Sequence, residues 1–171
     1  YTLTMPTKRI GRLARAMEPR AATITRRLDA IKALSAAGIP VTVMVAPVIP
    51  GLTDHEIEPI LAAAKAAGAR EAGYVLLRLP LEIKDLFREW LTEEFPDRAG
   101  RVIKLLQSMH GGEDYIAAFG HRQRGSGPYA DQIAQRFRLS LKRLGLNSER
   151  ESLRCDLFQR PVRRGGQLAL F

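Results

Sequence analysis

The sequence predicts an α/β fold with a parallel sheet, and three neighbouring segments carry this prediction. Residues 41–46 (VTVMVA) are rich in β-branched side chains and apolar on both faces, which is typical of a strand buried between helices. Residues 73–79 form a second apolar run that ends at Pro80. Between them, residues 54–67 place apolar side chains at helical spacing. Strand, helix and strand in this order indicate parallel βαβ units.

The segment before the first of these strands predicts a strand end, a short helix and a longer helix. Residues 1–5 have strand composition, and residues 8–17 fit a short helix. Either Thr23 or Thr25 is suited to cap the longer helix, and Gly38 is suited to end it. The apolar stripe of this helix consists of Ile24, Leu28, Ile31 and Leu34.

The loop after the first strand combines a strand stop, a turn and a helix start. Pro47 is expected to end the strand because it has no N–H to donate to the ladder, and Pro50-Gly51 turns the chain. Thr53 and Glu56 have the spacing of a capping box. The following helix should end at Gly68, with its inward face made by Ile57, Ile60, Leu61 and Ala64.

The chain beyond Pro80 is expected to be mostly helical. Residues 83–91 form an amphipathic pattern whose apolar members are Ile83, Leu86, Phe87, Trp90 and Leu91. Pro96 restarts a helix that runs to His110, and a further helix carries its apolar residues at positions 133, 137, 141 and 144. We therefore divide the chain into an α/β part at 1–80, a helical extension at 81–145 and an irregular basic tail at 146–171.

Composition indicates a soluble cytoplasmic protein of one domain. The chain has 171 residues, no run of about 20 apolar residues and no apolar core of a signal peptide. Its single cysteine, Cys155, excludes an internal disulfide, which fits a reducing compartment. We expect no membrane contact. A first residue of tyrosine in the middle of a strand pattern favours a piece of a longer protein.

The net charge of +9 is concentrated at the two ends. Residues 1–27 hold seven basic groups and one acid, and residues 101–171 hold thirteen and six. The middle, residues 28–100, holds seven basic groups and eleven acids. Basic ends are compatible with a nucleic-acid partner, but solvated arginines give the same composition, so both interpretations stay open.

Candidate catalytic residues do not form any complete signature of a known hydrolase, metalloprotease or phosphate-binding loop. Gly125-Ser126-Gly127 beside Arg122 and Arg124 fits either a phosphate cradle or a plain flexible turn. The three histidines are scattered, and His55 in a first helical turn is expected at the surface.

Glu18 and Arg20, together with Arg26 and Arg27, are the strongest polar candidates. They follow the strand expected at residues 1–5, and α/β proteins build their sites in the loops that follow strands. An arginine fork binds a carboxylate, and a glutamate binds a ribose hydroxyl or an ammonium group. A loop ion pair with surface arginines is the alternative.

Several motifs together give a family resemblance. They are MEPRA at 17–21, AGIPV at 37–41, APVIPGLTD at 46–54, GYVLLRLP at 73–80 and FGHRQRGSGPY at 119–129. In this order and spacing, over residues 10–145, the chain resembles the C-terminal part of radical S-adenosylmethionine (SAM) proteins related to spore photoproduct lyase.

The resemblance implies the C-terminal portion of a partial (β/α) barrel, in a protein that binds a [4Fe-4S] cluster and SAM and generates a 5′-deoxyadenosyl radical. Glu18, Arg20 and Arg27 then match the loop that contacts the SAM ribose or carboxylate. The stretch from Val43 to Pro50, which includes Val45 and Pro47, would lie along the adenine. The stretch from Tyr74 to Pro80 would close the pocket, with Arg78 facing it. Nucleic acid is a possible substrate.

The chain departs from the family pattern because the CxxxCxxC motif that holds the cluster is absent. The chain is thus expected to be inactive alone, either as a C-terminal piece of an enzyme or as a degenerate relative. The second alternative predicts a non-catalytic basic module that docks on DNA or on a sliding clamp.

The last five residues resemble the pentapeptide that binds the bacterial sliding clamp. Gln167, Leu168, Leu170 and Phe171 are the expected contacts, because short apolar anchors carry much of the energy of such interfaces. An apolar tail that folds back on its own domain is the alternative.

Overall fold

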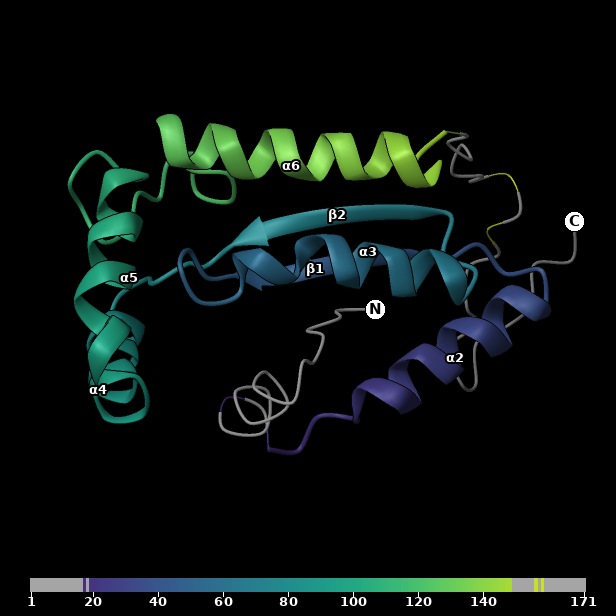
Figure 1. Ribbon diagram of the computed structural model, residues 1–171, viewed down its shortest axis with the longest axis horizontal. Helices are drawn as coiled ribbons and strands as arrows, with labels where there is room; N and C mark the ends of the chain where they lie inside the picture. Colours follow the sequence, from purple (N-terminus) through teal and green to yellow (C-terminus); the bar gives the residue numbers. More distant parts are fainter. Residues whose placement is uncertain (1–16, 18, 149–155, 157, 159–171) are drawn as a thin grey trace, which may run out of the picture.

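The computed structural model describes residues 17, 19–148, 156 and 158 (Figure 1). The strand expected at 1–5, the helix expected at 8–17 apart from Met17, and nearly all of the tail lie outside the described residues. The elements in chain order are α2 (Ile24–Ala36), β1 (Thr42–Val48), the 3-10 helix η1 (Asp54–Glu56), α3 (Ile57–Ala66), β2 (Glu71–Leu76), α4 (Ile83–Glu94), α5 (Pro96–Ser108) and α6 (Pro128–Leu144).

Strands β1 and β2 form a parallel pair joined by α3, which confirms the predicted α/β class and the parallel βαβ unit. Thr42 pairs with Glu71 at the start of the sheet, and Val48 pairs with Leu76 at its end. Within the described residues the sheet has two strands and does not close into a barrel. The described part of the chain is therefore a mixed α/β structure.

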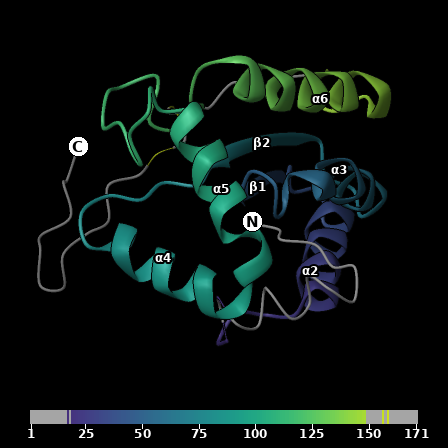
Figure 2. The same cartoon turned by 60° about the vertical axis from the view of Figure 1, so that its left-hand side comes forward.

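The helices occupy two places around the sheet. Helix α3 packs between α2 and α6, and α6 runs along β2 (Figure 1). Helices α4 and α5 pack on each other beyond the arrowhead of β2, as both views show (Figures 1 and 2). The strands thus point their carboxyl ends toward α4 and α5.

The two faces of the sheet differ, which corrects the expectation that both are buried. Tyr74 lies against Phe137 of α6, with ring centroids 4.7 Å apart, so its face is the helix-covered one. Val43 and Val45 share this face by alternation and are almost fully buried. The opposite face holds the intervening residues, which are exposed or half-buried: Thr42, Met44, Ala46, Glu71, Gly73 and Val75.

Pro47 does not end the first strand, contrary to expectation. Strand β1 continues through a cis Ala46–Pro47 bond to Val48. The ladder is irregular between Val45 and Val48, and proline is tolerated at such irregularities because no N–H is required there. The second strand also ends earlier than expected, at Leu76 instead of Leu79.

The capping box predicted at Thr53 and Glu56 is not formed. Thr53 precedes η1 but makes no side-chain bond to its amides. Its hydroxyl instead accepts a hydrogen bond from the backbone N–H of Ile49 at 2.8 Å, so it stabilises the turn that follows β1. The prediction for α2 is confirmed at Thr23, whose hydroxyl accepts from the N–H of Arg26.

The apolar faces of the helices agree with the sequence to different degrees. All four inward residues expected on α3 are buried. On α4 only Phe87 and Leu91 are buried, whereas Ile83 and Leu86 are 47% and 61% exposed. The amphipathic pattern of α4 therefore marks an apolar face of which only one side packs against the domain.

The edge of β2 that faces away from β1 is hydrogen-bonded to residues that do not belong to a strand. The side-chain amide of Asn147 accepts from the N–H of Ala72 at 2.7 Å and donates to the C=O of Ala72 at 3.0 Å. Near the other end of the strand, the N–H of Leu76 donates to the C=O of Gln123 at 2.9 Å. Both ends of this edge are thereby occupied.

Candidate functional site

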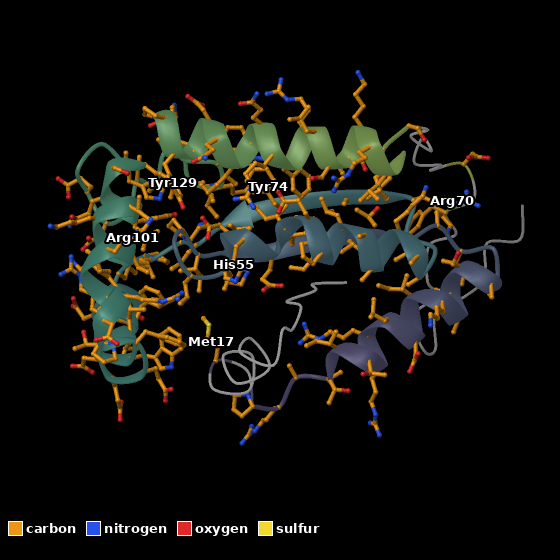
Figure 3. The ribbon with its side chains drawn as sticks, viewed as in Figure 1. Met17, His55, Arg70, Tyr74, Arg101 and Tyr129 are labelled. Carbon is orange, nitrogen blue, oxygen red and sulfur yellow. The ribbon has the colours of Figure 1, made fainter. Side chains whose placement is uncertain are left out.

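The carboxyl ends of the two strands meet at one edge of the sheet. The N–H of Leu77 donates to the C=O of Val48 at 2.9 Å, so the loops after β1 and β2 leave the sheet side by side. Met17 lies toward the same side of the molecule as the arrowhead of β2 (Figure 3). Loops at this edge are the usual ligand-binding elements of parallel α/β proteins.

The polar residues expected to bind a cofactor are only partly described. Glu18 lies outside the described residues. Arg20 is exposed in the loop before α2, and its guanidinium is accessible to a ligand. Arg27 is half-buried on α2, and its Nε donates to the C=O of Ala22 at 2.9 Å. Arg27 therefore helps to fix the loop that carries Arg20.

Val45 and Pro47, the residues expected along an adenine ring, have different positions. Val45 is 3% exposed and lies on the helix-covered face, so only its backbone is placed to contact a ligand on the other face. Pro47 is half-buried and lies in the irregular part of β1 near the carboxyl edge.

The open face of the sheet supplies residues that the sequence reading did not select. Met44 is paired with Gly73, and a Cβ built on Gly73 would lie only 2.9 Å from the Met44 sulfur. The flexible thioether thus lies against the backbone of β2. Ala46 and Val75 extend the same half-buried apolar surface toward the carboxyl edge. Alternation of side chains along the strands was the signal that could have found them.

Arg78 is held by an aromatic residue from a distant loop. Its Nη2 donates to the hydroxyl oxygen of Tyr115 at 2.9 Å, and its guanidinium carbon is 5.7 Å from the centre of that ring. The ring of His110 also makes an edge contact with Tyr115, with centroids 6.4 Å apart. His110 is 1% exposed, and burial lowers the pKa of its imidazole.

Arg88 and Asp114 form an ion pair next to Arg78, Tyr115 and His110. Arg88 Nη2 donates to both carboxylate oxygens of Asp114 at 2.8 Å, and Gln107 Nε2 donates to one of them at 3.0 Å. Burial alone would raise the pKa of Asp114, but the hydrogen bonds from Arg88 and Gln107 hold it below its ordinary value. Asp114 is therefore a carboxylate at neutral pH.

A second polar group connects the loop after β1 to α6. The hydroxyl of Tyr129 donates to the buried carboxylate of Asp54. Burial, together with this hydrogen bond, raises the pKa of Tyr129 to about 12. His55 is largely exposed, as expected, and its Nε2 lies 3.1 Å from the buried carboxylate of Glu56. Among the described residues no group of three or more histidine, cysteine or acidic side chains is arranged to hold a metal ion.

The loop at 117–127 presents arginines stacked on aromatic rings. The guanidinium of Arg122 lies 5.4 Å from the ring centre of Phe119, which is 88% exposed. Arg124 lies 4.1 Å from the ring centre of Tyr74. The N–H of Ser126 donates to the C=O of Met109 at 2.9 Å, so this amide is not available to cradle a phosphate.

Comparison with known proteins gives distant relatives only. No family model matches the chain, and no solved structure matches it significantly. The uncharacterized proteins Mb2609c of Mycobacterium bovis and Rv2578c of Mycobacterium tuberculosis are each 36% identical to it over 95 residues. These residues make up 54% of this chain and 28% of each relative, so the match covers little more than a quarter of the relatives' length. No helix in the described part of the chain has the length and hydropathy of a membrane span.

Proposed function

We propose that this chain forms part of the SAM-binding wall of a radical SAM enzyme. The observation that carries the proposal is the β1–α3–β2 unit, which has one helix-covered face and one half-exposed apolar face. The carboxyl edge of this unit collects the loops after both strands. Such an edge beside an uncovered sheet face is where a flat adenine ring and a charged amino-acid group would find apolar and polar contacts together.

The residues present suit SAM. The thioether of Met44 packs over Gly73, and together with Ala46 and Val75 it provides a half-buried apolar surface for a nucleobase. The backbone of Val45 and the ring of Pro47 border this surface. Arg20 offers an exposed guanidinium for the carboxylate, and Arg27 fixes the loop that carries Arg20. Glu18 is the expected ribose partner.

The residues present do not suit a [4Fe-4S] cluster. The chain contains one cysteine, whereas such clusters need several thiolate ligands. The cluster of the proposed enzyme would therefore require ligands from outside these 171 residues. Bound SAM supplies a sulfonium whose reductive cleavage is the source of a carbon radical, and the role of this chain is to bind and orient SAM.

SAM binding by the full-length protein under anaerobic conditions tests this proposal. Ala46→Trp would fill the open face, and we expect it to weaken SAM binding at least about tenfold, since a buried nucleobase cannot share that space. Ala62→Trp, on the exposed side of α3, is the matched control and should bind SAM normally. Unchanged SAM affinity in a folded Ala46→Trp protein would contradict the proposed surface. Formation of 5′-deoxyadenosine after reduction tests the reaction class.

Nucleic-acid binding is a second candidate, favoured by the exposed Phe119–Arg122 stack. Stacked aromatic and guanidinium groups bind unpaired bases, with affinity that falls as salt rises. Fluorescence anisotropy with a single-stranded oligonucleotide should show weaker binding by Phe119→Ala than by the control Leu139→Ala, which truncates an exposed residue on α6. Equal affinities would remove this loop from consideration.

A further inference from the structure

The buried side-chain nitrogen atoms that lack a hydrogen-bond partner within the described residues all fall in one neighbourhood. They are Arg78 Nε, Arg88 Nε, His110 Nδ1 and His110 Nε2. Arg78 and His110 both contact Tyr115, and Arg88 binds the adjacent residue, Asp114. Buried polar groups are nearly always satisfied, because leaving one without a partner costs about 1–3 kcal/mol. Their concentration in one neighbourhood is the observation that points to a ligand.

We propose that Arg78, Arg88, His110 and Tyr115 form a binding site for an oxyanion, a carboxylate or a phosphate group, at the carboxyl end of β2. The hydroxyl oxygen of Tyr115 accepts from Arg78, so its own proton is left to donate. Both arginine Nε–H groups are donors, and a neutral imidazole adds one more. The site is rich in donors, which is the chemistry that recognises an oxyanion.

The charge of the group agrees with a negatively charged ligand. Arg78 and Arg88 are cationic, whereas Asp114 is a carboxylate that neutralises one of them through two 2.8 Å contacts. Lys84 also acts electrostatically on Asp114, so positive charge exceeds negative charge among these groups, and the excess in a partly buried place needs compensation. This site goes beyond the proposed function, since it does not use the open face of the sheet.

A simple structural role for His110 makes the opposite predictions. A histidine that only fills space can be replaced by phenylalanine, and removing two unpartnered nitrogen atoms should then leave stability unchanged or raise it. His110→Phe therefore separates packing from binding, because it keeps a ring in the same place and removes both polar atoms. Tyr115→Phe similarly keeps the ring and removes the hydroxyl.

Isothermal titration of inorganic phosphate and of acetate into the full-length protein, without SAM, tests the site. We expect saturable binding of at least one anion by the wild type and by the control Arg138→Met, an exposed arginine of α6. Binding should weaken at least about tenfold in Arg78→Met and in His110→Phe, with folding checked by circular dichroism. If phosphate saturates the site at a lower concentration than acetate, the ligand carries a phosphate group. The reverse order identifies a carboxylate ligand.

Absence of saturable binding of both anions, or undiminished binding by folded His110→Phe, would overturn the assignment. Separate titration with SAM distinguishes this result from failure of the proposed function. Loss of SAM affinity in His110→Phe would place His110 in the cofactor pocket and would overturn the proposal of a separate oxyanion site. Normal SAM affinity together with lost anion binding would support both proposals.

Discussion

Arg136 of α6 donates two hydrogen bonds to the carboxylate of Glu58 of α3, from Nε at 2.8 Å and from Nη2 at 2.7 Å. The same guanidinium donates to the C=O of Asp54 at 3.1 Å. A planar guanidinium matches a carboxylate in this paired geometry, so the contact fixes the angle between the two helices as well as their distance. The connection joins residues 78 positions apart and holds α6 over the sheet.

Arg136→Met should destabilise the fold by about 1 kcal/mol at neutral pH, because both side chains are about one-third exposed and water weakens the pair. The hydrogen bond from Arg136 holds the pKa of Glu58 below its ordinary value. This stabilisation is present above the unfolded pKa of about 4.5 and is lost as the pH falls through the lower folded value. Urea unfolding at neutral pH and near pH 3 measures both effects. Arg138→Met is the control, and an equal loss there would contradict a specific pair.

Tyr129→Phe should cost about 1–3 kcal/mol, because it leaves the buried carboxylate of Asp54 without its donor. The pKa of Tyr129 is raised from 10.0 to about 12, so its contribution is complete below pH 10 and is lost as the pH rises toward about 12. Thermal unfolding across this range, with tyrosinate absorbance as a second signal, measures the difference. A wild type and variant of equal stability at neutral pH would show that the hydroxyl adds nothing.

Arg20→Ala should weaken SAM binding by about tenfold or more, since a charge-assisted contact to a carboxylate contributes about 1.5–3 kcal/mol. Lys32→Ala removes an exposed cation from α2 and is the matched control. Equilibrium dialysis with the full-length protein gives the two affinities. Unchanged binding by Arg20→Ala would count against Arg20 as the carboxylate ligand.

Deletion of residues 167–171 should abolish binding to a sliding clamp, with a loss on the order of 100-fold, because two or three apolar anchors carry most of such an interface. These residues lie outside the described part of the chain, so the prediction depends on the sequence alone. Ala169→Ser lies between the anchors and should bind normally. Surface plasmon resonance on immobilised clamp measures the difference, and binding that survives the deletion would end the hypothesis.

The sequence was sufficient where local pattern and tertiary burial agree. The α3 stripe was predictable because its four apolar residues all face one core. The exposure of Ile83 and Leu86 was not predictable. An amphipathic pattern shows which face of a helix is apolar, but it does not show how much of that face another element covers. The prediction that Pro47 ends the strand was wrong for a similar reason. Proline ends a strand whose hydrogen-bond ladder is regular, and the ladder here is irregular at that position.

The candidate sites were even less visible in the sequence. Arg78 and Tyr115 are 37 positions apart, and no local rule brings them together. His110 reads as a helix end in the sequence, and only tertiary packing makes it one of the most buried side chains. The resemblance selected Arg20, Val45 and Arg78, but it did not distinguish the two faces of β1.

The side-chain amide of Asn147 blocks one edge of the sheet to further strands. By bonding both the N–H and the C=O of Ala72, it imitates the backbone of a neighbouring strand, while Gln123 does the same for the N–H of Leu76. Another strand, whether from a second molecule or from an unfolded chain, cannot join β2 there without displacing them. Asn147 and Gln123 thus protect this edge of β2 against edge-to-edge aggregation.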